Sequence, residues 1–196
     1  MPVGDQSSTL DEGAFGGNTR SVMKTLYLFR HAKSSWKDQQ LDDFDRSLSK
    51  RGRTAATAMG RLLAEKQINP SQVLCSSSRR TRETLARIQE ELVTPVPVRF
   101  EKGLYLAESA TLLRRVRRLN DSLQSVMLIG HNPGLQQFAL MLADGAEGAH
   151  RLQLAAKFPT GSLAVLESEI NRWGEFQPGS AVLTEFVRPR DLPQEI

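Results

Sequence analysis

The chain of 196 residues contains a single cysteine, Cys75, and only three histidines, His31, His131 and His150. One cysteine excludes an intrachain disulfide framework and a zinc site built from several cysteines. No apolar run approaches the roughly 18 residues that a membrane span requires. The first residues also lack the basic start and the continuous apolar stretch of a signal peptide. We therefore expect no membrane partner and a cytoplasmic location.

Aromatic residues are scarce, at 6% of the chain, whereas 19 of the 26 basic residues are arginine and the net charge is +4. The arginine side chain holds a phosphate group with two donors at once. The densest basic run is Arg114–Arg118 (RRVRR), and it contains no aromatic residue. A solvated helix face explains this run better than a nucleic acid partner, which we do not expect. A non-enzymatic nucleic-acid-binding domain is the remote alternative, and its binding would weaken steeply with salt.

The length fits one domain at roughly 150 residues per domain. Residues 1–22 are rich in glycine, serine and threonine and show no hydrophobic period, which predicts a flexible N-terminal tail. The domain is expected over residues 23–188, with residues 189–196 as a C-terminal tail. Met23 directly precedes the first strand-like run, so it is a candidate for the natural start.

Short apolar runs typical of buried strands alternate with helical patterns along the domain. The predicted strands are Thr25–Phe29, Gln72–Cys75, Val96–Phe100, Ser125–Ile129, Ser162–Leu166 and Ala181–Phe186. The predicted helices are Ser47–Lys66, Arg79–Leu92, Ser109–Leu123 and a segment that runs from about Gly134 to Ala143. This alternation predicts an α/β fold with a mostly parallel sheet and helices on both faces, that is, a three-layer α-β-α sandwich.

Histidine and arginine side chains stand where three of these strands end. Arg30 and His31 follow the first strand, Arg80 lies in the segment after the second, and His131 follows the strand 125–129. In such sheets, ligands bind at the carboxyl ends of the strands. We therefore expect these four side chains to converge on one crevice. His150 lies in a Gly/Ala-rich segment without a motif, and it is given no role.

These residue types suit a phosphate dianion. Arg30 and Arg80 can hold it through paired donors, and His131 can donate a further hydrogen bond. Neighbouring cations favour neutral His31, whose free ring nitrogen can attack phosphorus. The product is a covalent phosphohistidine that water can hydrolyse. This chemistry needs no metal or other cofactor, and the sequence contains no HExxH motif and no P-loop.

These motifs resemble those of the histidine phosphatase superfamily, also called phosphoglycerate mutase-like. Leu28–Ala32 (LFRHA) resembles its RHG signature, Ser76–Leu85 (SSSRRTRETL) its second block, and Gly130–Asn132 (GHN) its second histidine block. The blocks occur in family order and cover roughly residues 25–142. The resemblance implies a phosphoglycerate mutase-like fold, with His31 as nucleophile and Arg30, Arg80 and His131 as phosphate-binding residues.

Within this superfamily the segments 30–36, 45–52 and 130–134 look most like the SixA-type phosphohistidine phosphatases. This resemblance implies a phosphorylated protein as substrate, such as a histidine phosphotransfer domain, with a small phosphate ester as the alternative. The additional substrate-binding residues that we expect are Ser34, Trp36, Arg46 and Asn132.

Two features depart from the family pattern. Ala32 replaces the glycine of RHG. Larger relatives also insert a lid and a glutamate acid between the second arginine and the second histidine, where this chain has a short segment. Glu108 is the candidate acid, with Glu101 and Asp43 as alternatives, although an ordinary carboxylate favoured by a helix start also explains Glu108. Without an acid and a lid, we expect a phosphohistidine, whose imidazole leaves readily, rather than an alkoxide ester.

Overall fold

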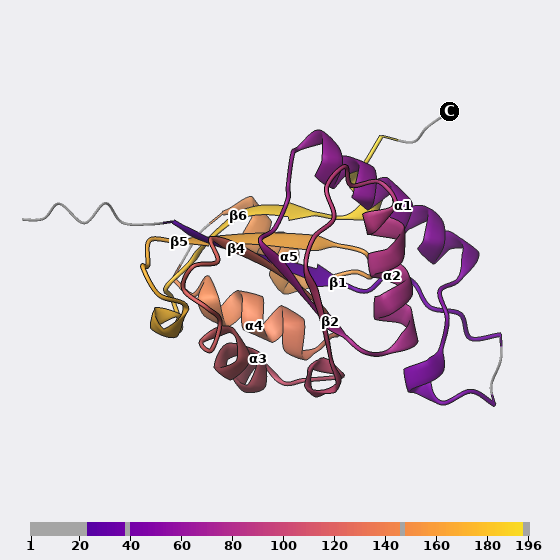
Figure 1. Cartoon of the computed structure of the whole chain (residues 1–196), viewed down its shortest axis with the longest axis horizontal. Helices are drawn as coiled ribbons and strands as arrows, with labels where there is room; N and C mark the ends of the chain where they lie inside the picture. Colours follow the sequence, from indigo (N-terminus) through magenta and orange to yellow (C-terminus); the bar gives the residue numbers. More distant parts are fainter. Residues whose placement is uncertain (1–22, 38–39, 146–147, 194–196) are drawn as a thin grey trace, which may run out of the picture.

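The computed structural model describes residues 23–37, 40–145 and 148–193. Its sheet has the strand order β3-β2-β4-β1-β5-β6. Three neighbouring pairs are parallel, β2 with β3, β2 with β4 and β4 with β1, whereas β5 runs antiparallel to both β1 and β6 (Figure 1). The strands are β1 (Lys24–Arg30), β2 (Gln72–Ser76), β3 (Val98–Glu101), β4 (Ser125–Gly130), β5 (Leu163–Ser168) and β6 (Val182–Val187).

Helices cover both faces of this sheet. The helices are α1 (Lys50–Glu65), α2 (Arg79–Gln89), α3 (Ser109–Val116), α4 (Gly134–Leu142) and α5 (Ala149–Ala156). Apolar residues of α1 and α2 share one core cluster with the sheet, and those of α3, α4 and α5 share the other. The prediction of a three-layer α-β-α sandwich with a mostly parallel sheet is therefore confirmed.

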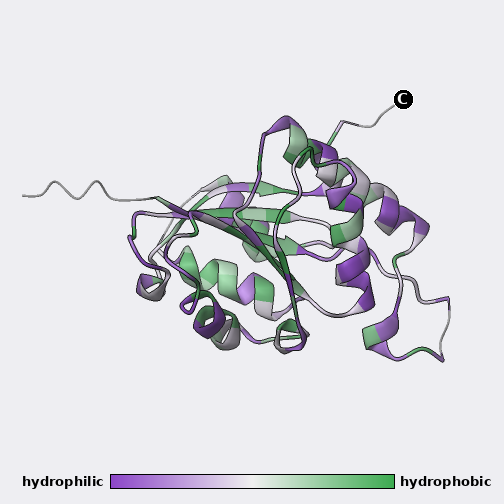
Figure 2. Ribbon diagram, viewed as in Figure 1, coloured by the Kyte–Doolittle hydropathy of each residue, from purple (hydrophilic) through white to green (hydrophobic). Residues whose placement is uncertain are grey.

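The central strands supply both halves of the core because successive side chains point to opposite faces of a sheet. In β1, Leu28 packs on the side of α3 and α4, and Phe29 packs on the side of α1 and α2. Leu128 and Ile129 of β4 divide in the same way. Hydrophobic residues accordingly concentrate in these strands and in α4 (Figure 2).

Three helices are shorter than predicted, and one of them, α2, ends at Gln89 rather than at Leu92. α1 begins at Lys50 rather than at Ser47, because the side chain of Ser49 accepts a hydrogen bond from the Gly52 amide and caps the helix. α3 ends at Val116 rather than at Leu123. The following segment turns instead of continuing the helix, and the Lys24 ammonium donates to the carbonyl oxygens of Asp121 and Leu123. These tertiary contacts override the helical pattern.

The sequence analysis did not predict α5, and His150 lies in this helix rather than in a loop. The fully buried side chain of Leu154 attaches α5 to the core. Part of the predicted C-terminal tail forms a 3-10 helix, Pro189–Asp191, which contacts α1. Residues 1–22 of the predicted N-terminal tail and residues 194–196 lie outside the described residues, and Met23 is the first described residue.

Most arginine side chains of the basic run at residues 114–118 bond to other groups of the same chain. Arg115 forms an ion pair with Glu101 at 2.6 Å, and Nε of Arg117 donates to the carbonyl oxygen of Gly174. Within the described ranges, no helix is both long and apolar enough to cross a bilayer.

Candidate active site

The candidate site lies at the carboxyl ends of three adjacent parallel strands. β4 pairs with β1 and β2, so that Gly130 stands opposite Arg30 and Ile129 stands opposite Cys75. His31 and His131 therefore leave the sheet side by side, with ring centroids 5.0 Å apart. Their closeness follows from strand register, because each histidine directly follows its strand.

These histidines line a cavity of about 400 Å³. The cavity also brings together the other predicted phosphate-binding and substrate-binding residues, Arg30, Ser34, Trp36, Arg46, Arg80 and Asn132. Its further lining residues are Lys33, Asp43, Leu106 and Thr160. Glu108 is not among them: it precedes α3 with an exposed side chain. The candidate acid is thus not brought to the cavity.

The imidazole of His31 is neutral, and one of its ring nitrogens already forms a hydrogen bond within the protein. Its Nδ1 lies 2.8 Å from the carbonyl oxygen of Ala32, to which it must donate because a carbonyl only accepts. The lone pair is therefore on Nε2. Burial lowers the pKa of His31 to about 3 against the opposing hydrogen bond to Ala32, and the charges of Arg80 and Arg30 add to the lowering.

Two guanidinium groups face this imidazole. Nη1 of Arg30 donates to the carbonyl oxygen of Phe158 at 2.6 Å, whereas its buried Nε has no partner among the described residues. Burial and the nearby charge of Arg80 lower the pKa of Arg30. Arg80 is 3% exposed, while the neighbouring Arg79 pairs with Glu83 at the surface. Two like charges held this close favour an anion between them.

Asp43 is the counter-ion of Arg80 and Arg46. Its carboxylate accepts from Nη2 of Arg80 at 2.9 Å, from Nη1 of Arg46 at 2.7 Å and from the Tyr105 hydroxyl at 2.6 Å, and its backbone carbonyl accepts from Nη1 of Arg80. Burial alone would raise the pKa of Asp43, but the Tyr105 hydrogen bond and the two arginines lower it to about 2. An ionised carboxylate does not serve as an acid in this arrangement.

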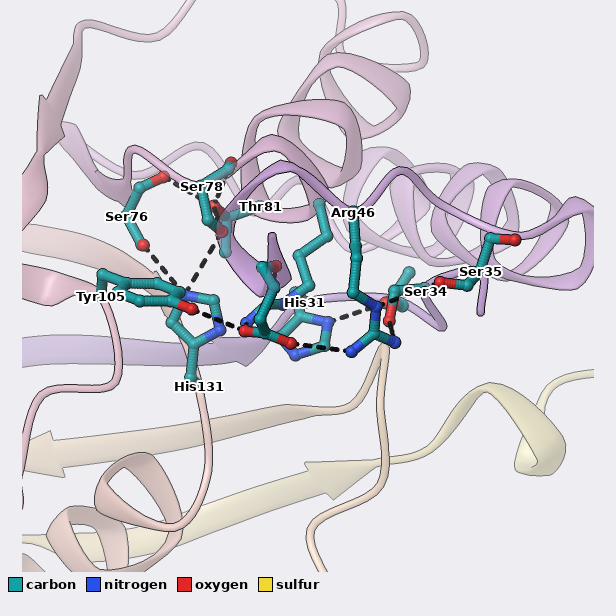
Figure 3. Close-up of polar contacts among 12 residues, drawn as sticks. His31, Ser34, Ser35, Arg46, Ser76, Ser78, Thr81, Tyr105 and His131 are labelled. Carbon is teal, nitrogen blue, oxygen red and sulfur yellow. Dashed lines mark hydrogen bonds and ion pairs between the residues drawn. The ribbon is translucent and has the colours of Figure 1, made fainter. Parts of the chain in front are cut away.

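Hydrogen bonds from Arg46 connect the loop after His31 to the segment that contains Asp43. Its Nη2 donates to Ser34 Oγ at 2.6 Å, and its Nε donates to the Ser35 carbonyl oxygen at 3.1 Å (Figure 3). The guanidinium carbon lies 3.2 Å from the centroid of the Trp36 ring. Trp36 is 69% exposed, so a large apolar surface stands at the rim of a polar cavity.

The backbone beside His31 is held from two helices. The Ala32 amide donates to Thr84 Oγ1, which in turn donates to the carbonyl oxygen of Arg80. Gly52 of α1 approaches the loop so closely that a Cβ there would lie 2.0 Å from the Lys33 carbonyl oxygen. Only glycine fits this contact. The loop that follows His31 is therefore fixed before any ligand arrives.

Tyr105 also belongs to the site, although it was not predicted from the sequence. Its ring contacts His131 edge-on at a centroid distance of 5.3 Å and lies 5.6 Å from the Arg80 guanidinium carbon. A signal was available, since Tyr105 closely follows β3, which is the neighbour of β2 in the sheet. The strand-end rule could have been applied to this strand too.

A larger cavity, of about 630 Å³, lies between α1 and the C-terminal segment. It is lined by Arg51, Arg61 and Arg190 among other residues, but no histidine or cysteine belongs to its lining. Chemistry therefore favours the smaller cavity as the active site.

The two buried histidines predict how stability depends on pH. Burial, His31 and Arg80 lower the pKa of His131 to about 2, and that of His31 is about 3. Between these values and the ordinary 6.5, the unfolded chain binds protons that the folded chain does not. The contribution of the two histidines to the free energy of unfolding is therefore fully present above pH 6.5. It falls as the pH is lowered, by up to about 1.4 kcal/mol per pH unit for each histidine.

Urea denaturation at pH 7.5 and pH 5 measures this loss. The pKa of Asp43 is lowered from 3.8 to about 2, so its contribution to stability changes with pH only below 3.8, outside that window. A double variant, His31→Asn with His131→Asn, should show a clearly smaller difference between the two pH values. An equal difference in both proteins would contradict the neutral, buried state of the histidines.

Comparison with known proteins places this geometry in a family. Residues 26–105 match the model of the histidine phosphatase superfamily (branch 1). An uncharacterised protein of Mycobacterium tuberculosis is 34% identical over 82% of this chain and 99% of its own length. Two solved structures, each described as "putative phosphohistidine phosphatase SixA", share the fold. The one from Nakamurella multipartitia has a TM-score of 0.74 and 28% identity, and covers 85% of this chain and 96% of its own.

The other, from Agrobacterium tumefaciens, has a TM-score of 0.71 and 29% identity over 85% of this chain and 98% of its own. The family match includes His31, Arg80 and Tyr105, which lie together at the carboxyl edge of the sheet. The chain therefore belongs to the histidine phosphatase superfamily and is a SixA-like phosphatase.

Proposed function

We propose that this phosphatase forms a covalent phosphohistidine on His31 and that its substrate is a phosphohistidine side chain of another protein. The hydrogen bond from His31 Nδ1 to Ala32 carries the proposal, because it leaves the Nε2 lone pair available in a cavity with Arg30 and Arg80. Arginine donors at the cavity stabilise the charge that the transferring phosphoryl group spreads over its oxygens. No step in this scheme calls for a metal.

The chemistry proceeds in two displacements at phosphorus. In the first, the substrate ring carries a proton on its other nitrogen, Nε2 of His31 forms a bond to phosphorus while the P–N bond of the substrate breaks, and the electron pair of that bond leaves with a neutral imidazole. In the second, water attacks phosphorus, the bond to Nε2 breaks, and inorganic phosphate is released. His31 returns to its neutral form, ready for another cycle.

The charges at the cavity favour a leaving group that needs little protonation. Asp43 is the one carboxyl group among the described residues that line the cavity, and its pKa is lowered to about 2. An alkoxide leaving group requires a proton donor from the enzyme, whereas a phosphohistidine that is protonated on its other ring nitrogen releases a neutral imidazole. The absence of a suitable acid among these residues supports a phosphoramidate substrate.

The surroundings of the cavity suit a protein partner. The residues between Arg80 and His131 form the rest of α2, then β3, a 3-10 helix at Lys102–Leu104, α3 and β4. Exposed Trp36 and Leu106 stand at the rim, where a partner surface can bury them. The second candidate is a small phosphate ester, because a cavity of about 400 Å³ falls within the range of small-ligand sites.

A comparison of substrates tests the proposal. The purified protein is given a histidine-phosphorylated phosphotransfer domain and, separately, a panel of sugar phosphates and nucleotides. We expect kcat/KM for the phosphoprotein to exceed every ester by about 100-fold or more. A higher kcat/KM for any ester would overturn the protein substrate and favour the second candidate.

A further inference from the structure

The two ring nitrogens of His131 lie in different surroundings. Nε2 is 2.9 Å from Ser76 Oγ and 3.4 Å from Ser78 Oγ, whereas buried Nδ1 has no hydrogen-bond partner among the described residues. The side of the ring away from the serines faces His31 (Figure 3). His131 is 3% exposed and lies beside Arg80, an environment that favours the neutral ring. A neutral imidazole has one N–H, so its position decides what His131 can donate to.

The hydroxyl groups around Nε2 can be assigned in turn. Thr81 Oγ1 lies 2.6 Å from the carbonyl oxygen of Ser76 and 2.8 Å from that of Ser78. Since carbonyl oxygens only accept, the single proton of Thr81 is used there. Thr81 Oγ1 must then accept the hydrogen bond from Ser78 Oγ, at 2.8 Å. Ser78 has no proton left for His131.

Ser76, unlike Ser78, still has a hydroxyl proton available for His131. Its side chain is fully buried, and its Oγ has no hydrogen-bond partner other than Nε2 of His131 among the described residues. The contact is built by the sheet, because Ser76 ends β2 and His131 directly follows the paired strand β4. Ser76 is therefore the hydroxyl with a free proton within hydrogen-bond distance of this nitrogen.

We propose that Ser76 is a positioning residue, which donates its hydroxyl proton to Nε2 of His131 and so keeps the imidazole proton on Nδ1. In this tautomer an N–H faces the side of His31, where it can donate to a bound phosphate oxygen. The opposite tautomer would present a lone pair to the anion. The phosphate role rests on the proposed function, whereas the tautomer is a property of the protein alone.

The tautomer can be read directly by NMR. A long-range ¹H–¹⁵N correlation of the ¹⁵N-labelled protein distinguishes protonated from bare ring nitrogens. With three histidines in the chain, the variants His150→Gln and His131→Asn assign the signals. We expect His131 to be protonated on Nδ1 in the wild-type protein. In Ser76→Ala the proton should move to Nε2, from where it can reach Ser78 Oγ.

Ser77→Ala is the matched control, because Ser77 Oγ is buried but contacts nothing within hydrogen-bond distance among the described residues. Its spectrum should match the wild type, and Ser76→Thr, which keeps a hydroxyl, should restore Nδ1–H. Ser76→Ala should also weaken inhibition by orthovanadate by about 10- to 100-fold, the loss expected for a hydrogen bond to an anion.

A wild-type spectrum with the proton on Nε2 would overturn the proposal without any variant having to fold. Unchanged ring signals in folded Ser76→Ala would overturn it as well. If the signals shift as expected but the protein hydrolyses no phosphohistidine, the proposed function fails and the assignment of the tautomer stands.

Discussion

Replacing His31 with alanine is expected to lower kcat by at least about 1,000-fold, because loss of a nucleophile removes the whole covalent route rather than one stabilising contact. The wild-type ring has its Nδ1 bonded to Ala32 and a pKa lowered to about 3, so its Nε2 is unprotonated at neutral pH. Among the described residues that line the cavity, no other histidine has its Nδ1 bonded to a backbone carbonyl. Single-turnover release of phosphate from a phosphorylated phosphotransfer domain measures the loss.

The control is His150→Ala, which removes an exposed histidine in α5 that does not line the cavity. This variant should keep the wild-type rate. Circular dichroism and thermal unfolding of His31→Ala should show a folded domain. A folded His31→Ala protein that retains more than about a tenth of the rate would remove the covalent mechanism.

Arg80→Ala is expected to lower kcat by about 100- to 1,000-fold, the loss typical of one donor to a developing oxyanion. Its guanidinium is buried at the start of α2 and lies close enough to His31 and Arg30 to lower both of their pKa values. Loss of this charge also leaves Asp43 without its Arg80 partner, which makes the cavity less favourable for an anion. Steady-state kinetics with the phosphoprotein measures the effect.

Arg79→Ala is the matched control, because it removes an arginine from the same turn of the same helix and changes the net charge equally. Arg79 is at the surface, where it pairs with Glu83. Its loss should change kcat less than about twofold. Equal losses in the two variants would mean that overall charge, rather than the contact made by Arg80, supports the reaction.

The part of the site that could be predicted from the sequence is the part that strand ends determine. His31 and His131 directly follow buried strands, and their meeting needs only that β1 and β4 be neighbours in a parallel sheet. Arg80 begins the helix after β2, which pairs with β4 on its other side. A short apolar run is a strong local signal for a buried strand, and such runs located all the strands of the described sheet.

The remaining features depend on tertiary contacts that no local pattern encodes. The sequence left Asp43 as a candidate acid, and its role as counter-ion becomes visible only once Arg46, Arg80 and Tyr105 surround it. α5 was missed because its Gly/Ala-rich surroundings resemble a loop, although the burial of Leu154 stabilises the helix. α3 was predicted too long because the bonds from Lys24 to Asp121 and Leu123 are remote in sequence.

We propose that one phosphate site is built from His31, Arg30, Arg80 and His131. A crystal structure of the protein soaked with tungstate shows whether these four side chains bind one anion together. We predict one anion in the cavity of about 400 Å³, within bonding distance of His31 Nε2 and in contact with both arginines and His131 Nδ1. Tungstate bound in the arginine-lined groove beside α1, with none beside His31, would contradict the account.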